Sequence, residues 1–280
     1  MSISFDRIAF AVAAAFLVAS AGGSLHAEWI TSEYVISPFV RTSELPPGVT
    51  ASDAKDEFVT EACPNAKFEY SISYPRGMDG GGPVDRAIIA MGQEYVAAAQ
   101  SRGETFLANV VDDCEPDMPA YTQLSYDTVT SRPVRVSSAA YAVMFVEENY
   151  FGGNHSAITL TAVNLLDDGS EITLGRLFPD PARSLPLLWE HVFRGFCRDH
   201  DTAPIFYGSQ PCGSAVPPVP DPLKSPGSGL GSAGAAVLTG RGLSIHLSDY
   251  AAYSYAEGIQ FLDIPSDALI GMGADRTFWQ

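Results

Sequence analysis

The chain is poor in positive charge. Its 280 residues include 16 Lys+Arg against 33 Asp+Glu, which gives a formal net charge of −17. Such a balance repels the phosphate backbone of nucleic acids and the surface of anionic lipids, so nucleic acid is excluded as a partner. The same excess of acid attracts cationic partners, although it also serves the plainer purpose of keeping an exported protein in solution.

Motifs of metal and nucleophilic chemistry are also missing. The sequence has no Cys-x-x-Cys, His-x-His, His-Glu-x-x-His or Gly-x-Ser-x-Gly pattern, which argues against zinc sites, thioredoxin-type centres and an activated serine. One acidic run contains Asp112, Asp113, Glu115 and Asp117. It lacks the 12-residue spacing of a calcium-binding EF-hand, and a solvated loop is the preferred interpretation. We predict no metal site and no cofactor.

An apolar run from Ile8 to about Ala21 falls short of the ~20 residues of a comfortable membrane span. It follows Arg7 and leads into small residues that end at Ala27. This layout is typical of a secretory signal peptide over residues 1–27, with Ala21 as the alternative cleavage point. We expect a periplasmic or secreted protein with no membrane span in its mature part.

Cysteine is scarce but even in number, at Cys63, Cys114, Cys197 and Cys212. An even count in an exported chain indicates disulfide bonds, and four cysteines allow three pairings. We favour Cys63–Cys114 with Cys197–Cys212, because each of these pairs closes a loop within one half of the chain.

Alternating and helical patterns occur in both halves. Phe68, Tyr70, Ile72 and Tyr74 alternate with polar residues in "KFEYSISYP", which predicts a half-buried strand over 67–75. A helix is expected from Pro83 to a stop at Gly103, and another from a Ser184 cap to about His200. Further strands are expected near 121–131, 134–150 and 154–166, and a tight hairpin at 240–242. The fold class is therefore α+β, with antiparallel sheets and a helix packed in each half.

The expected organisation has three parts after the signal peptide. Residues 28–62 form an extended N-terminal segment, residues 63–157 a first α+β module, and residues 158–280 a second α+β module. A Pro/Gly/Ser-rich loop at 214–234 interrupts the second module.

The bend "YFGGNH" at 150–155 joins two of the expected strands. Glycine reaches positive φ without steric cost, so Gly152 and Gly153 suit a turn or bulge, with His155 bonded to the open backbone. The alternative is an acid/base pair of His155 with Glu147 or Glu148, which alternate onto opposite faces of the incoming strand. We favour the structural turn and predict no catalytic residue.

Two segments, "YFGGNH…TAVNLLDDGSEITLGRLF" and "LTGRGLSIHLSDYAAYSYAEGIQFLDIPSDAL", carry a family resemblance. They resemble exported bacterial proteins with two adjoining modules, domains of unknown function 4163 and 3298. The first segment shows this in a Gly-Gly-x-His turn and a Leu-x-x-Leu-Phe run. The matched positions are Gly152, Gly153, His155, Asn164, Gly169, Leu174, Leu177, Phe178, Leu243, Ile245, Tyr250, Tyr253, Ala256, Gly258, Phe261, Ile264, Pro265 and Leu269.

The resemblance implies an α+β fold and, for some relatives, the sensing of lysozyme by the outer half of a membrane-anchored anti-sigma factor. Tyr250, Tyr253 and Tyr255 are candidate binding residues, since tyrosine is enriched at interfaces. We therefore expect a non-enzymatic binding module for a basic protein such as lysozyme, or for peptidoglycan. The alternatives are a hydrolase of envelope polymers that uses His155 with a nearby carboxylate, and a structural envelope protein.

Overall fold

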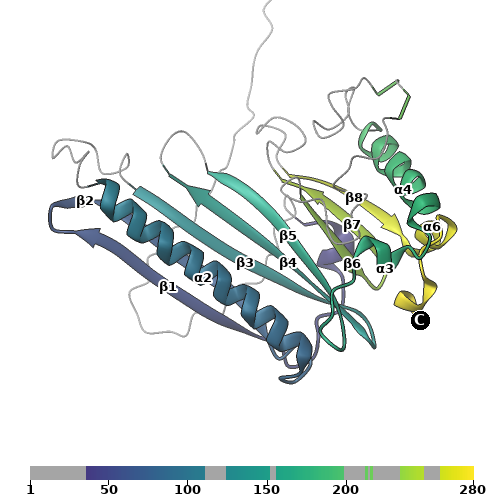
Figure 1. Cartoon of the computed structure of the whole chain (residues 1–280), viewed down its shortest axis with the longest axis horizontal. Coiled ribbons are helices and arrows are strands. Elements are labelled where there is room, and N and C mark those ends of the chain that lie inside the picture. The colour runs from purple at the N-terminus through teal and green to yellow at the C-terminus, as the bar shows by residue number, and fades with distance from the viewer. Residues whose placement is uncertain are drawn as a thin grey trace, which may run out of the picture.

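The computed structural model describes residues 36–110, 124–151, 156–198, 212–213, 215–216, 234–248 and 259–280. Strands and helices occur in both halves of this part (Figure 1). The strands are β1 (Thr50–Thr60), β2 (Cys63–Arg76), β3 (Leu124–Ser137), β4 (Ala140–Tyr150), β5 (Ala157–Leu166), β6 (Gly234–Thr239), β7 (Gly242–Leu247) and β8 (Gln260–Pro265). The helices are α1 (Pro38–Arg41), α2 (Pro83–Val110), α3 (Leu174–Leu177), α4 (Pro181–Phe196), α6 (Ser266–Gly271) and the 3₁₀ turn η5 (Arg276–Trp279).

Two sheets organise the fold, and the α+β class is confirmed. The larger sheet has the order β1-β2-β3-β4-β5, and the smaller has the order β6-β7-β8. Neighbouring strands are antiparallel except β2 and β3, which run parallel over Lys67–Ile72 and Leu124–Val129. The expectation of antiparallel sheets did not include this pair. A parallel pair needs a crossover, and the chain between β2 and β3 contains α2.

Helix α2 covers one face of the larger sheet (Figure 1). The expected alternation in β2 is confirmed, since Phe68, Tyr70, Ile72 and Tyr74 are all buried beneath the helix. The helix does not stop at Gly103 but continues to Val110. Gly103 is needed there for close packing, because a Cβ at this position would lie 2.5 Å from the ring of Phe58.

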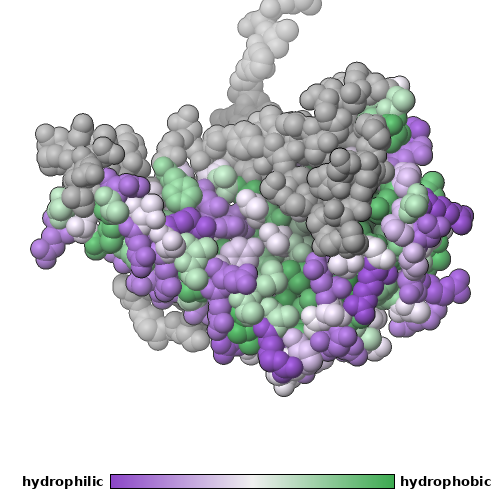
Figure 2. Space-filling view, in the orientation of Figure 1, coloured by the Kyte–Doolittle hydropathy of each residue, from purple (hydrophilic) through white to green (hydrophobic). Residues whose placement is uncertain are grey.

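The surface seen from the α2 side is mixed in character. Figure 2 shows hydrophilic and hydrophobic residues interspersed over α2 and the strands beside it.

The smaller sheet lies against the opposite face of the larger one, where Val134, Ala142, Met144 and Leu160 join its core. The Asn164 side chain joins the two sheets directly. Its Nδ2 donates to the Ala236 carbonyl at 2.9 Å, and its Oδ1 accepts from Leu238 N at 2.8 Å.

The second large helix packs on the smaller sheet. Residues of one stripe of α4, among them Leu188, Val192 and Phe196, are buried as the four-residue spacing predicts. The helix begins at Pro181 and not after Ser184, since the Asp180 carboxylate accepts from Arg183 N and caps it. Asp followed by Pro is a strong signal for a helix N-terminus, so the sequence does indicate the observed start of this helix.

The N-terminal segment is tied to both sheets. Ser37 N donates to His246 Nε2 of β7 at 3.0 Å, and Arg132 Nη2 of β3 donates to the Arg41 carbonyl at 3.0 Å. Ile36 and Val40 are fully buried in the core between the sheets. Residues 50–60 are extended, as strand β1 at the edge of the larger sheet. That sheet also continues through β5, across the module boundary expected at residue 157.

The boundary between the strands expected at 121–131 and 134–150 differs from the sequence expectation. A break was expected after 131, but β3 runs through Pro133 to Ser137. The pairing with β2 ends at Val129, so the missing N–H of Pro133 removes no hydrogen bond on that side. The hairpin at Gly240-Arg241, between β6 and β7, lies where it was expected.

The expected disulfide Cys197–Cys212 is present. Cys63 is also disulfide-bonded. Cys114, its expected partner, lies outside the described residues. In the part of the chain that the structure describes, no helix is long and apolar enough to cross a membrane.

Candidate functional site

A concavity lies on the larger sheet, opposite α2 and beyond the smaller sheet. Strand alternation sends one set of side chains from β1–β4 to this side. We call this surface the open face and define it by Lys55, Glu57, Lys67, Glu69, Ser71, Tyr126, Thr128 and Glu148. It encloses a groove of about 880 Å³, which Lys55–Glu57, Glu69–Ser71, Tyr126–Thr128 and Glu148 line.

One lysine of the open face is already neutralised. Lys67 Nζ lies 2.6 Å from Glu57 Oε2 and 2.9 Å from Glu69 Oε2. Side-chain hydrogen bonds to Glu57 and then to Glu69 raise the pKa of Lys67 above its ordinary value. Two carboxylates therefore share this ammonium group, and Lys55 is a second cation at the same end of the groove.

Glu148 is held by hydroxyl groups instead of a cation. Its Oε1 accepts from Tyr126 Oη at 3.0 Å and from Ser156 Oγ at 2.6 Å. The Tyr126 ring stacks on Tyr150, with centroids 5.5 Å apart. Burial, followed by the bond to Glu148, raises the pKa of Tyr126 to about 12. Tyr126 is thus a protonated donor throughout the physiological range.

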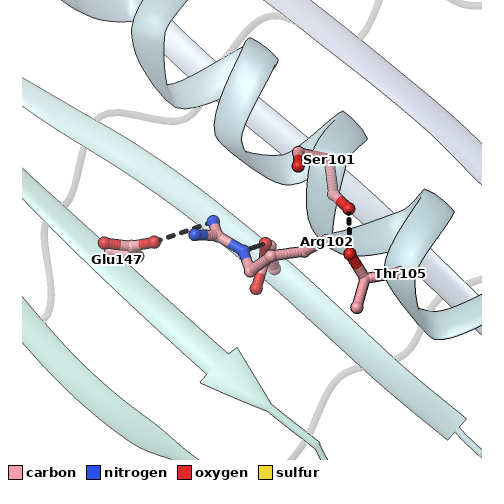
Figure 3. A network of polar contacts seen from close by, with 5 residues as sticks. Ser101, Arg102, Thr105 and Glu147 are labelled. Carbon is pink, nitrogen blue, oxygen red and sulfur yellow. Dashed lines mark hydrogen bonds and ion pairs between the residues drawn. The ribbon is translucent and has the colours of Figure 1, made fainter. Parts of the chain in front are cut away.

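Glu147 points to the other side of the sheet, as the alternation along β4 predicts. Its Oε1 accepts from Arg102 Nη2 of α2 at 3.0 Å, and Arg102 Nε also pairs with Asp127 (Figure 3). The Asp127 side chain is 0% exposed. Its burial raises its pKa, and the hydrogen bond from Arg102 opposes this. The network joins α2 to β3 and β4.

A serine, a histidine and an aspartate also meet between α1, β7 and β8. Ser244 Oγ lies 2.7 Å from Ser37 Oγ and 2.7 Å from Asp263 Oδ1, while His246 Nε2 accepts from the Ser37 backbone N–H. A catalytic triad needs an imidazole that bonds a reachable hydroxyl. Here the imidazole accepts from a main-chain group, and Ser37, Ser244 and His246 are 0% exposed. Burial lowers the pKa of His246 to about 4, with the backbone of Ser244 opposing. The cluster anchors the N-terminal segment.

The structure separates the predicted site residues. Glu148 lines the groove, whereas Glu147 pairs with Arg102 on the other side of the sheet, so the two alternative partners of His155 lie on opposite faces. Gly152, Gly153 and His155 lie outside the described residues, as do Tyr250, Tyr253 and Tyr255. The catalytic and turn interpretations of the bend, and the tyrosine patch, stay predictions. Among the described side chains, no group of three or more His, Cys, Asp or Glu could hold a metal ion.

Sequence reasoning missed Tyr126 and the role of the open face. The signal lay in the alternation of β3, where Tyr126 and Thr128 fall on the side opposite to Asp127 and Val129. Their neighbours Glu69 and Glu148 could not be assigned without the pairing of β3 with both β2 and β4.

No protein-family model and no curated protein matches the chain. Solved structures do match the chain. A DUF3298 family member from Bacteroides fragilis is 13% identical and has a TM-score of 0.56, over 85% of this chain and 97% of that one. A DUF3298 family protein from Pseudomonas aeruginosa is 11% identical, with a TM-score of 0.52 over 84% of this chain and 99% of the other. The chain therefore has the fold that these DUF3298 family proteins share.

Proposed function

We propose that the protein is an exported, non-catalytic binding module of the DUF3298 type, and that it binds a basic protein on the open face. The observation that carries this proposal is the groove of about 880 Å³ with its excess of carboxylates. The predicted signal peptide and the disulfides at Cys63 and Cys197–Cys212 support export, since disulfides persist in oxidising compartments.

Electrostatics selects the class of partner. The chain carries a net charge of −17, and its groove contributes Glu57, Glu69 and Glu148 against Lys55 and the shared Lys67. Complementary charge raises the association rate and suppresses acidic partners. A small basic protein of the lysozyme type fits this field, and the resemblance in the sequence points to the same class.

The chemistry of the groove supports binding over catalysis. An acid/base catalyst needs a group that changes protonation near neutral pH. Tyr126 has its pKa raised to about 12, so it stays protonated near neutral pH. In the part of the chain that the structure describes, the groove lining contains no histidine, cysteine or metal cluster.

Binding to lysozyme tests the proposal, with the protein lacking residues 1–27 and an acidic protein as the negative control. We expect retention at low ionic strength and a steep loss at moderate salt, because exposed charges more than about 10 Å apart are screened at 0.1 M. Thr128→Lys puts a cation in the groove, and Thr105→Lys makes the same change on exposed α2.

The two lysine variants should separate sharply. Thr128→Lys should weaken binding at least tenfold, because it places a positive charge in the groove. Thr105→Lys raises the net charge by the same single unit, away from the groove, and should stay within about threefold of the unmodified protein. Equal losses in the two variants would show that only the overall charge matters. No retention at low salt would remove the proposal altogether.

A further inference from the structure

We infer that Glu148 and Tyr126 form a subsite that receives one lysine ammonium group of the basic partner. This inference rests on the proposed function and assigns the residue type that the open face recognises. It follows from how Glu148 is held, from which other acids are already paired, and from the aromatic stack beside it.

Glu148 is a preorganised acceptor. Both hydroxyl donors, Tyr126 Oη and Ser156 Oγ, bond the same atom, Oε1. They come from β3 and from the chain just before β5, so they fix the carboxylate from two sides. Oε2 accepts no hydrogen bond from the described residues. A charged acceptor with one fixed and one open oxygen loses little conformational entropy when a cation binds.

The other acids that line the groove are less suited. Glu57 and Glu69 both bond Lys67, so their charge is partly compensated. Asp127 lies on the α2 side with Arg102. Asp56 accepts from the Glu57 backbone N–H at its Oδ1 and occupies the exposed edge strand. Glu148 is therefore the groove carboxylate that two neutral side-chain donors fix in place and that has no ion pair with the described residues.

The aromatic stack adds a second element of cation recognition. Tyr126 and Tyr150 stack at 5.5 Å beside the carboxylate. A cation over a tyrosine ring gains about 0.5–1 kcal/mol at exposed sites, and more where water is removed. A carboxylate next to a ring face is suited to a group that is both charged and carried on an apolar stem, such as a lysine side chain.

The hydrogen bonds of Glu148 distinguish ammonium from guanidinium. The preferred arginine contact is bidentate and uses both oxygens of a carboxylate. Because Oε1 already accepts two hydrogen bonds, Oε2 provides a single-point contact. A lysine ammonium is a compact point charge that needs one such acceptor. The subsite therefore favours lysine over arginine.

Amino sugars of an envelope glycan also carry ammonium groups. The net charge of −17 and the carboxylates spread along the groove favour a partner that presents several cations in three dimensions, which is a folded basic protein. We therefore assign the subsite to a protein lysine, and a partly deacetylated chitin oligomer serves as the competing probe.

Calorimetry with the protein lacking residues 1–27 tests the subsite. The probes are a lysine-rich peptide, an arginine-rich peptide of equal length and charge, lysozyme, and the chitin oligomer. The variant Glu148→Gln keeps the side-chain length and an oxygen acceptor for Tyr126. Glu104→Gln, on the exposed side of α2, makes the same charge change away from the groove.

We expect the lysine-rich peptide to bind more tightly than the arginine-rich one. Glu148→Gln should weaken lysine-peptide and lysozyme binding at least fivefold and abolish the preference for lysine, while Glu104→Gln should change neither. Tyr126→Phe, which removes one fixing hydroxyl, should reduce the preference for lysine in part.

Three results would overturn the inference in different ways. If Glu148→Gln behaves like Glu104→Gln while Thr128→Lys still abolishes lysozyme binding, the open face binds but the subsite is wrong. If the chitin oligomer binds more tightly than the peptides and depends on Glu148, the ligand is a glycan. If no basic probe binds at low salt, the subsite fails together with the proposed function.

Discussion

Replacing Arg102 by methionine removes the cation between α2 and the larger sheet. Arg102 donates to Asp127 and to Glu147, whose side chains are 0% and 15% exposed. The variant leaves both carboxylates in place, with Asp127 fully buried and without its cation. Methionine keeps much of the apolar length of the arginine side chain, so the change acts mainly on charge.

The magnitude follows from the two lost contacts. A hydrogen bond to a charged group contributes about 1.5–3 kcal/mol, and breaking a buried pair costs about 3–5 kcal/mol. Arg102 itself is 32% exposed, so water screens part of the interaction. We expect Arg102→Met to lower the free energy of unfolding by about 3 kcal/mol at neutral pH. For a chain of this size, that corresponds to a fall in melting temperature of roughly 6–12 °C.

The loss should depend on pH in a direction that identifies its cause. Burial already raises the pKa of Asp127, and Arg102 opposes this. Without Arg102 the pKa of Asp127 rises further. The Asp127 carboxyl is then protonated up to a higher pH in the folded protein than in the unfolded chain. The difference in unfolding free energy between the variant and the unmodified protein should therefore be largest at pH 8 and smaller near pH 4.

Urea unfolding at several pH values measures the effect. Arg102→Lys, which keeps a cation, should lose less than Arg102→Met, and Asp127→Asn in the methionine background should recover part of the loss. A pH-independent loss, or no recovery in the double variant, would refute the argument that the buried carboxylate causes the destabilisation.

Three further predictions concern the core. Because the pKa of His246 is lowered to about 4 in the folded protein, the unfolded chain binds more protons below about pH 6.5. The free energy of unfolding should therefore fall by about 3 kcal/mol between pH 6.5 and 4. Urea unfolding should show that His246→Gln lacks this pH dependence. Asn164→Ala leaves two backbone groups of β6 unpaired and should cost about 2–4 kcal/mol, measured by thermal unfolding. Gly103→Ala should lower the free energy of unfolding by about 1–3 kcal/mol, because the added methyl group overlaps Phe58. The higher helix propensity of alanine alone would raise it by about 1 kcal/mol, so the sign of the measured change distinguishes the two effects.

Local patterns predicted those features whose cause is local. The alternation of β2 placed its four buried aromatic and aliphatic residues on one face, and the alternation of β4 separated Glu147 from Glu148. The glycine hairpin at 240–242 and the Cys197–Cys212 bond follow from turn chemistry and loop closure within short stretches. In each case the residues that decide the structure lie within about 15 positions of one another.

The features that were missed depend on distant partners. From the sequence alone, Gly103 indicates a helix end, because its packing against Phe58 cannot be seen there. In the same way Pro133 indicates a strand break, because the sequence does not show that the pairing of β3 with β2 ends at Val129. The groove requires the parallel pairing of β2 with β3 across the intervening α2. His246 is buried because the N-terminal segment, 209 residues earlier, covers it. Side-chain type and spacing do not encode these contacts.

Zero-length carbodiimide coupling is the most direct test of recognition at the open face, since it joins a carboxylate to a lysine ammonium only where the two are in contact. With lysozyme as the partner at low salt, we expect mass spectrometry to find Glu148 joined to a lysozyme lysine. This product should disappear at moderate salt and in Thr128→Lys. Coupling spread over α2 carboxylates such as Glu94 and Glu104, with none at Glu148, would contradict it.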